Sequence, residues 1–407
     1  MKRFLKFTVL IIFGLFLLLN LFILFSGKWY VYTAVSKTYF RGQGGPDIYD
    51  LDLFPKREIK KSSQPKELVE NIITKSLPQD IETELDGIKT TSFLVMRNDT
   101  ILFEKYWGDH TKETVSNSFS AVKSFVSVLI GIAIDEGKIS SIEAKVGDYL
   151  PEFKKGKLKE ITIHDLLNMS SGLSWSESGK NPFSNNAEAY YGTELEHLVL
   201  SQTVERKPGI KFNYQSGNTE LLALIIEAAT GKNISNYLNE KIWSKIGASH
   251  DAYWSLDHKN GQEKAFCCFY ATTRDFAKFG LLILNNGVAN GKQIIPASYM
   301  KLMFKNDPLK TVEKIPNTRY GLQWWTYNDI RYARGILGQY IIIIPRLNMV
   351  IVRTGHKRES DLTISSAQRK DKVFMEKNAA KVGHPKDLFT YLRFAEYLSS
   401  LKKQLRN

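Results

Sequence analysis

Residues 118–137 have the sequence SFSAVKSFVSVLIGIAIDEG, which is so apolar on every side that it predicts a helix buried in the centre of the protein. Gly137 is placed to end that helix. Two polar residues, Ser120 and Lys123, lie near its start, and residues three apart share one face of a helix. The sequence therefore predicts a serine hydroxyl and a lysine amine close together, in a place that holds little water.

This pairing has a chemical use. A lysine held away from water loses stability as a cation, so its pKa falls and its neutral amine can take a proton from the serine. Amides at the start of the helix would favour the negative charge that develops beside Ser120. The alternative is that Ser120 only caps the helix while Lys123 reaches solvent. The string Ser-x-x-Lys is common in this chain and also begins at Ser63, Ser298, Ser399 and Ser400.

Segments on both sides of this helix predict strands of one antiparallel sheet. Residues 91–96 and 101–107 are rich in β-branched and aromatic residues and flank a polar turn, which is typical of a hairpin. Residues 340–344 and 349–353 repeat the pattern around a second turn. The two hairpins are expected to share one sheet.

The region between the hairpins predicts short helices joined by long polar loops. Thr162 can cap a helix over 164–169, and residues 219–230 form another apolar stretch. An amphipathic helix near 387–402 closes the chain. The expected fold class is α/β (α+β), an antiparallel sheet flanked by helices with an inserted, mostly helical region at about 140–260.

The N-terminal residues predict a transmembrane helix. Residues 7–25 are almost uninterrupted Phe, Leu, Ile and Val, and about 19 residues at about 1.5 Å each can cross a hydrocarbon core. Lys2, Arg3 and Lys6 precede this run and favour a cytoplasmic N-terminus, with everything after residue 26 on the outer side. A retained anchor is favoured over a cleaved signal peptide, because the run is long and no small-x-small site follows it.

The length suggests two or three domains, although a single elaborated α/β body can also reach this size, and the composition allows an ordinary packed core. The chain has 407 residues, of which 43% are hydrophobic and 24% charged, so a disordered or coiled-coil chain is excluded. We expect a signal anchor at 1–27, a juxtamembrane connector at 28–85 and the folded domain at 86–407. The net charge of +14 comes from scattered basic residues, which argues against nucleic-acid binding.

Several kinds of site are not expected. The seven histidines are dispersed, Walker and dinucleotide-binding motifs are absent from the sequence, and we predict neither a metal nor a cofactor. Cys267 and Cys268 are neighbours, and adjacent thiols do not normally meet the geometry of a disulfide. They are expected to act as small hydrophobic residues.

Several motifs, in order along the chain, resemble the serine β-lactamase-related hydrolases. This superfamily includes penicillin-binding proteins, class C β-lactamases, related esterases and 6-aminohexanoate-dimer hydrolase. The resemblance covers about residues 85–360. Its first element is Ser120-Ala121-Val122-Lys123 and its second is Tyr214-Gln215-Ser216; supporting segments lie at 164–173, 272–280 and 320–325.

The resemblance implies roles for these residues. Ser120 would be the acylated nucleophile, with Lys123 and Tyr214 sharing the work of base and acid, and Ser216 would hydrogen-bond Lys123 at the substrate side. The alternative, which the sequence favours less, is that Tyr214 is a half-buried aromatic residue at a loop-to-helix boundary. Tyr270 and Trp324 are candidate substrate contacts, together with Tyr190, Tyr191 and Trp325, although core packing explains each of them equally well.

The third element of the family pattern departs from its relatives. Where many relatives carry Lys-Thr-Gly or His-x-Gly, this chain has Ala333-Arg334-Gly335. Gly335 still permits close approach of substrate, so the amides of Ser120 and Ile336 could form an oxyanion hole. The missing Lys or His argues against efficient β-lactam turnover, and Arg334 could replace it only if its side chain faces the cleft.

Three functions follow as hypotheses. The first is a membrane-anchored, extracytoplasmic serine hydrolase that cleaves an ester or amide of a small-molecule or peptide substrate through an acyl-enzyme. The second is a non-catalytic, penicillin-binding-like sensor of cell-wall peptides or β-lactams. The third is a purely structural envelope protein. The sequence does not choose between esterase, amidase and peptidase activity.

Overall fold

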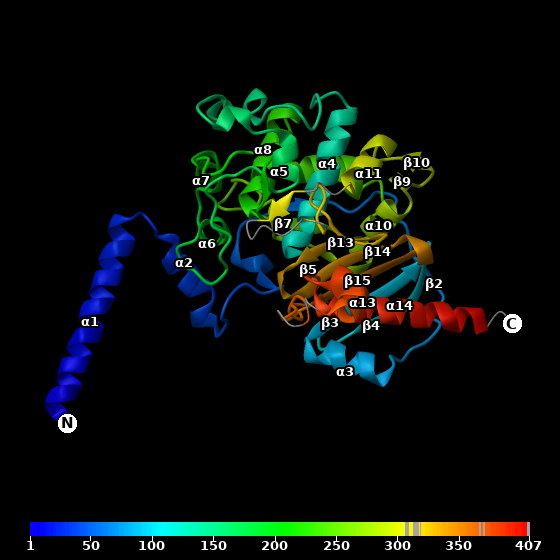
Figure 1. The fold of residues 1–407 in the computed structure, drawn as a ribbon, viewed down its shortest axis with the longest axis horizontal. Helices are drawn as coiled ribbons and strands as arrows, with labels where there is room; N and C mark the ends of the chain where they lie inside the picture. Colours follow the sequence, from blue (N-terminus) through cyan, green and yellow to red (C-terminus); the bar gives the residue numbers. More distant parts are fainter. Residues whose placement is uncertain (306–308, 312–316, 318, 366–367, 369–370, 405–407) are drawn as a thin grey trace.

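The main sheet of the protein has seven strands in the order β12-β13-β14-β15-β3-β4-β2 (Figure 1). The computed structural model describes all residues except 306–308, 312–316, 318, 366–367, 369–370 and 405–407. Neighbouring strands are antiparallel except β2 and β4, which are parallel. The strands are β2 (Val69–Glu70), β3 (Thr90–Arg97), β4 (Thr100–Tyr106), β12 (Trp325–Tyr327), β13 (Ile330–Gly335), β14 (Gln339–Ile344) and β15 (Met349–Gly355).

The two predicted hairpins meet at the centre of this sheet. β3 pairs with β4 and β14 with β15, and β15 then pairs with β3, so that Ile351 lies opposite Val95. The prediction that the two hairpins share one sheet is therefore confirmed. The side chains of these strands alternate between two separate apolar clusters, one on each face of the sheet.

Helices cover both faces. On one face the helices α3 (Gln79–Gly87) and α14 (Lys386–Gln404) pack on Phe93 and Phe103. On the other face lie α10 (Thr273–Leu284) and α4 (Lys123–Asp135), which belong to the larger cluster. The predicted central helix is confirmed as buried, since nearly every side chain of α4 is inaccessible to solvent. The expected fold class is thus the observed one.

Short helices dominate the inserted region. Thr162 caps α5 as expected, because its hydroxyl accepts a hydrogen bond from the Asp165 amide at 3.1 Å. The helices here and near the end of the chain are α5 (Ile163–Leu167), α6 (Asn185–Tyr191), α7 (Leu195–Leu200), α8 (Ser216–Thr230), α9 (Ile234–Leu238), α11 (Ala297–Met303) and α13 (Lys372–Asn378). Short two-residue strands also occur: β6 (Lys211–Phe212), β9 (Val288–Ala289), β10 (Lys292–Gln293) and β11 (Lys310–Thr311).

The N-terminal segment has two distinct parts. Helix α1 (Lys2–Phe25) is long and apolar enough to span a membrane or to serve as a signal sequence. Most of its length is separated from the domain (Figure 1), and among the described residues only its C-terminal end makes contact, where Phe22 packs on Phe183. The residues after it pack onto the domain instead of forming a free linker. They include α2 (Tyr30–Lys37) and β1 (Lys56–Ile59), the edge strand of a second sheet with β7 (Ala252–Ser255), β8 (Phe269–Thr272) and β5 (Val115–Asn117).

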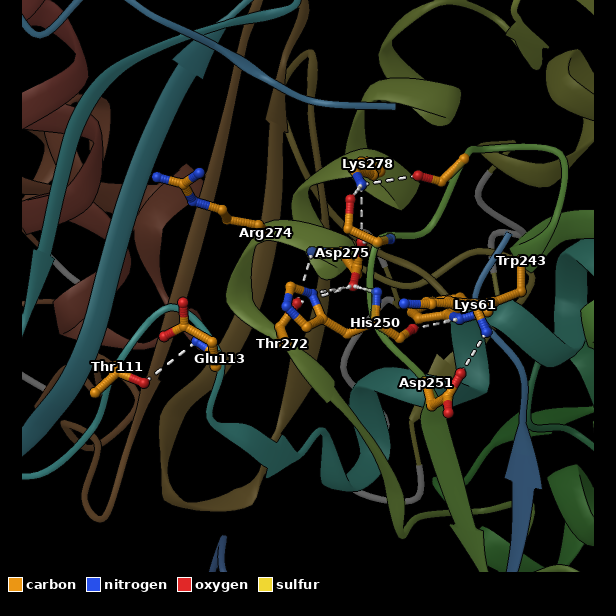
Figure 2. A network of polar contacts seen from close by, with 12 residues as sticks. Lys61, Thr111, Glu113, Trp243, His250, Asp251, Thr272, Arg274, Asp275 and Lys278 are labelled. Atoms are coloured by element: carbon orange, nitrogen blue, oxygen red, sulfur yellow. Dashed lines mark hydrogen bonds and ion pairs between the residues drawn. The ribbon is translucent and has the colours of Figure 1, made fainter. Parts of the chain in front are cut away.

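A buried carboxylate ties α10 to the loop before β7 (Figure 2). Asp275 accepts hydrogen bonds from the Ser249 amide at 2.8 Å and the His250 amide at 3.0 Å, and it pairs with Lys278 at 3.0 Å. The His250 ring lies 3.3 Å from the same carboxylate. Its hydrogen bond to Asp275 raises the pKa of His250 above its ordinary value, while partial burial and Lys278 oppose this rise.

The His250 contact predicts pH-dependent stability. Because the folded protein raises the pKa of His250, protonated His250 stabilises the fold below about pH 6.5, and this contribution is lost as pH rises through the raised value. His250→Gln should therefore destabilise the protein more at about pH 5.5 than at about pH 8.5, by less than about 1 kcal/mol because the ring is partly exposed. Urea unfolding at both pH values measures this, and an equal loss at both would contradict it.

Candidate active site

Ser120 lies in a tight turn between β5 and α4. The turn spans Phe119–Val122, and α4 itself begins at Lys123, so the first turn of the predicted helix is a 3-10 turn. Phe119 has a positive φ of 44°, which is uncommon for a residue with a side chain. Its amide donates to Asn117 Oδ1 at 2.8 Å and holds this sharp change of direction. The nucleophile candidate therefore sits at a constrained corner.

The structure brings Ser120 and Lys123 together. Lys123 Nζ lies 3.1 Å from Ser120 Oγ and 3.1 Å from Ser216 Oγ, and it donates to the Phe266 carbonyl at 2.6 Å. Its side chain does not reach solvent, since the residue is only 1% exposed. Three acceptors match the three donors of an ammonium group. A neutral amine in the same place would present its lone pair to the serine hydroxyl.

The surroundings of Lys123 favour that neutral form. Burial lowers its pKa to about 8, although the carboxylates of Glu177 and Glu220 act in the opposite direction. Glu220 is itself buried and accepts from the Ala265 amide at 2.8 Å. This hydrogen bond fixes the backbone at Ala265. The carbonyl of the next residue, Phe266, accepts the hydrogen bond from Lys123 Nζ. Lys123 is thus poised to exchange a proton near neutral pH.

Tyr214 lies beside the pair. Its ring centroid is 5.4 Å from Lys123 Nζ, and the ring stacks on Trp325 at 6.0 Å. Burial raises the pKa of Tyr214 well above its ordinary value, and a hydrogen bond with Ser120 opposes the rise. A phenol with a raised pKa keeps its proton at neutral pH. The arrangement therefore suits Lys123 as the base and Tyr214 as a proton donor.

Glu177 is a part of the site that the sequence did not reveal. Ser216 Oγ donates to Glu177 Oε1 at 2.6 Å, and the Ser216 amide donates to Oε2 at 2.7 Å. Trp175 Nε1 donates to the same Oε2 at 2.8 Å. Burial raises the pKa of Glu177, and Lys123 lowers it. A continuous chain of contacts thus runs from Glu177 through Ser216 and Lys123 to Ser120.

The segment Ala333-Arg334-Gly335, the third element of the family pattern, lies against the turn Phe119–Val122 that carries Ser120, which we call the nucleophile turn. A Cβ atom on Gly335 would lie 2.2 Å from the Ser118 carbonyl oxygen, so only glycine allows β13 to approach this closely. Ile336 follows directly and lines a cavity with Ser120. The Arg334 guanidinium lies 4.1 Å above the Trp325 ring and 3.2 Å from Asp361. Arg334 therefore lies on the Tyr214 side of the site.

The cavity beside Ser120 has a volume of about 150 Å³ and a mostly apolar lining. Tyr190 and Tyr191 line it, as does the buried Glu177. Tyr270 and Trp324, which the sequence suggested as substrate contacts, are fully buried and are not among its lining residues. Trp324 stacks on Phe279 and Tyr270 accepts a hydrogen bond from Asn117. The cavity beside Ser120 is lined by Pro46, Phe119, Ser120, Glu177, Ser178, Gly179, Asn186, Ala187, Tyr190, Tyr191, Ser216, Phe266, Cys267 and Ile336.

The expectation for the two cysteines was wrong. Cys267 and Cys268 form a disulfide, and both are buried, with Cys267 at the cavity. Adjacent cysteines in an extended strand do not bond, because neighbouring side chains point to opposite faces. Instead β8 begins only at Phe269, and Cys268 has a positive φ of 63°. The bond closes a very small ring and ties no distant segments together.

Comparisons with known proteins show which proteins this chain is similar to. The chain matches the sequence profile of the family described as Beta-lactamase over residues 78–369. The 6-aminohexanoate-dimer hydrolase of Paenarthrobacter ureafaciens is 27% identical over 293 residues, which are 67% of this chain and 74% of that protein. A putative penicillin-binding protein of Bacillus subtilis is 27% identical over 213 residues, or 50% of this chain and 51% of that protein.

Solved structures share the fold. A putative 6-aminohexanoate-dimer hydrolase from Bacillus anthracis has a TM-score of 0.70 at 24% identity and covers 85% of this chain and 92% of its own. A family VIII carboxylesterase has a TM-score of 0.57 at 17% identity and covers 76% and 98%. The segment that matches the family model, residues 78–369, contains Ser120, Lys123 and Tyr214. The protein therefore belongs to the β-lactamase family of serine hydrolases.

Proposed function

We propose that the protein is a membrane-anchored serine hydrolase that cleaves an ester or amide through an acyl-enzyme on Ser120. The observation that carries this proposal is the buried Lys123 amine, 3.1 Å from Ser120 Oγ. Nucleophilic catalysis by serine needs a base within hydrogen-bond reach whose pKa lies near the working pH. Lys123, with its pKa lowered to about 8 by burial, meets both requirements.

The reaction would proceed in two balanced halves. Ser120 Oγ forms a bond to the carbonyl carbon of the substrate while its proton passes to Lys123. The bond from that carbon to the leaving oxygen or nitrogen then breaks, and the leaving group takes a proton from Tyr214, which Lys123 restores. Water then forms a bond to the acyl carbon and gives a proton to Lys123. The bond from that carbon to Ser120 Oγ breaks, Oγ takes the proton back from Lys123, and the acid leaves. The amides of Ser120 and Ile336 would stabilise the oxyanion in both halves.

The location is also part of the proposal. Helix α1 would remain in the membrane as an anchor, because it is long and apolar and the rest of the protein covers almost none of its surface. Lys2, Arg3 and Lys6 precede most of its apolar length and would hold that end in the cytoplasm. The catalytic domain would then lie on the outer side of the membrane.

Labelling followed by a substrate chase tests the function. Full-length protein in detergent is treated with a fluorescent fluorophosphonate, and intact and peptide mass spectrometry locate the label, which is expected on Ser120. Unlabelled protein is then incubated with aryl esters, short amino-amide dimers and a chromogenic cephalosporin. Repeated turnover of an ester or amide supports the proposal. Permanent acylation by β-lactams without turnover of any substrate would support a sensor instead, and absence of label would leave a structural role.

Glu177→Gln should change the pH dependence more than the maximal rate. Glu177 favours the charged form of Lys123, so removing its carboxylate should lower the pKa of that amine further. The acid limb of kcat/KM should then move to lower pH by up to about 1 unit. Gln can keep its carbonyl toward the Ser216 amide and Trp175, so the fold should persist.

The shift is measured from pH–rate profiles of the wild type, Glu177→Gln and a control variant, Glu205→Gln. Glu205→Gln serves as the matched control, because Glu205 is exposed on the surface and pairs with Arg206. The control should leave the limb unmoved. A Glu177→Gln limb that coincides with the wild type would show that Glu177 acts only as a structural support for Ser216.

A further inference from the structure

The cavity beside Ser120 is built in part by the chain that leaves the membrane helix. Residues 28–54, which we call the juxtamembrane strap, pack on α6, the helix that lines this cavity. Tyr30 is buried, and Lys28 forms an ion pair with Glu188 at 3.5 Å. Near the end of α1, Phe22 packs edge-on against Phe183, with ring centroids 5.3 Å apart. Phe183 and Glu188 both belong to the segment that carries the cavity lining.

The strap then continues to the nucleophile turn. Pro46 lines the cavity, and the Ile48 carbonyl accepts a hydrogen bond from the Asn117 amide at 2.9 Å. Asp50 accepts from Tyr190 Oη at 3.2 Å. The strap is therefore fixed at both sides of the cavity, by α6 at one side and by β5 at the other.

The tether between membrane and cavity is short. Only residues 26–29 separate α1 from α2, and four residues reach at most about 14 Å even when fully extended. Since α2 packs on α6, the cavity-lining helix must lie close to the surface of any membrane that α1 spans. Figure 1 shows α1 leaving the domain on the side of α2 and α6.

The outer surface of the strap has the composition of a membrane interface. Trp29, Tyr39 and Phe40 are 55%, 68% and 83% exposed. Basic residues lie beside them, at Lys28 and Arg41. Aromatic rings prefer the headgroup level of a bilayer, and nearby lysine and arginine attract anionic lipids. Contact with lipid headgroups would account for the exposure of these three aromatic rings.

We infer that the strap rests on the outer surface of the membrane, and that the substrate is an ester or amide carried by an amphiphile resident in that leaflet. This inference rests on the proposed hydrolase and on its anchoring. The apolar lining of the cavity, which includes the half-exposed Ile336, suits a group that arrives from an apolar phase. A substrate embedded in the membrane would reach Ser120 without crossing bulk water.

The position of the strap is tested without turnover. Full-length Phe40→Cys protein is labelled with an environment-sensitive fluorophore and reconstituted into vesicles of phosphatidylcholine and phosphatidylglycerol that contain a spin-labelled phospholipid. The two native cysteines are buried and disulfide-bonded, so only the new thiol should react. Tyr397→Cys on α14 is the matched control, because Tyr397 is also an exposed aromatic residue. Quenching at 40 but not at 397 is expected; no quenching at 40 would overturn the inference.

The substrate class is tested with two esters that share one reacting centre. 4-Methylumbelliferyl acetate is soluble, whereas 4-heptadecylumbelliferyl acetate partitions into the same vesicles. The reconstituted wild type should favour the anchored ester. The ratio of anchored to soluble rates should fall about tenfold, or about 1.4 kcal/mol, in the double variant Tyr39→Ser/Phe40→Ser. Tyr397→Ser should keep the wild-type ratio.

The outcomes separate this inference from the function beneath it. If the wild type hydrolyses the soluble ester at least as fast as the anchored ester, the inference of a membrane substrate is wrong. The proposal that the protein is a hydrolase is then still supported. Absence of fluorophosphonate labelling and of turnover of every ester and amide in the wild type would refute the hydrolase, while quenching at position 40 would still report where the strap lies.

Discussion

Ser120→Ala is expected to lower hydrolysis by about 10³-fold or more, because no other group can take the place of the acylated oxygen. Fluorophosphonate labelling should also be absent in Ser120→Ala. The fold should persist, since the change removes one hydroxyl at a partly exposed position and surface changes of this size cost about 0.5 kcal/mol or less. Steady-state rates, gel fluorescence and thermal unfolding of the variant measure the three expectations.

The chain supplies a matched control for this variant. Ser298 begins the same four-letter string, with Lys301 three residues later, but it lies exposed on α11. Ser298→Ala should keep wild-type activity and labelling. If Ser120→Ala retained full activity, the acyl-enzyme would have to form elsewhere and the proposed mechanism would be refuted.

Lys123→Met is expected to cost about 10² to 10⁴-fold in kcat/KM, the range that a positioned general base contributes. Methionine fills a similar volume without a charge, so the buried site should remain folded. In the wild type kcat/KM should rise with pH and level off above about pH 8, as Lys123 loses its proton. The residual activity of Lys123→Met should lack this rise.

The pH–rate profile of both proteins, with thermal unfolding as a check on folding, tests this assignment. Lys301→Met, the partner of Ser298 in the control string, should leave the profile unchanged. A wild-type limb that persists in Lys123→Met would assign the titration to another group and leave the base unidentified.

Local pattern predicted much of the framework. The buried helix, the two hairpins and the Thr162 cap all follow from periodicity and turn chemistry within about 20 residues of sequence. The contact between Ser120 and Lys123 follows from their spacing on one turn. These features have a short-range cause, so the sequence displays them directly.

Long-range features escaped the same reasoning. Glu177 lies in a polar loop, and nothing local indicates that its carboxylate would be buried against Ser216. Trp324 and Tyr270 were candidate substrate contacts because aromatic residues that pack in a core and those that line a cavity look alike in sequence. The disulfide depends on a positive φ at Cys268, which no strand pattern predicts.

The packing of the strap has a consequence for how the protein can be truncated. A fragment cut to the family-matched residues 78–369 would lose Pro46 from one wall of the cavity and β1 from the edge of the second sheet. It would also lose α14, whose Leu388 and Phe394 are fully buried. Such a truncation would expose apolar surface on one face of the main sheet and open the pocket to solvent. The strap, β1 and α14 therefore belong to the same folding unit as the family-matched segment, and changes in the strap are expected to alter the cavity beside Ser120.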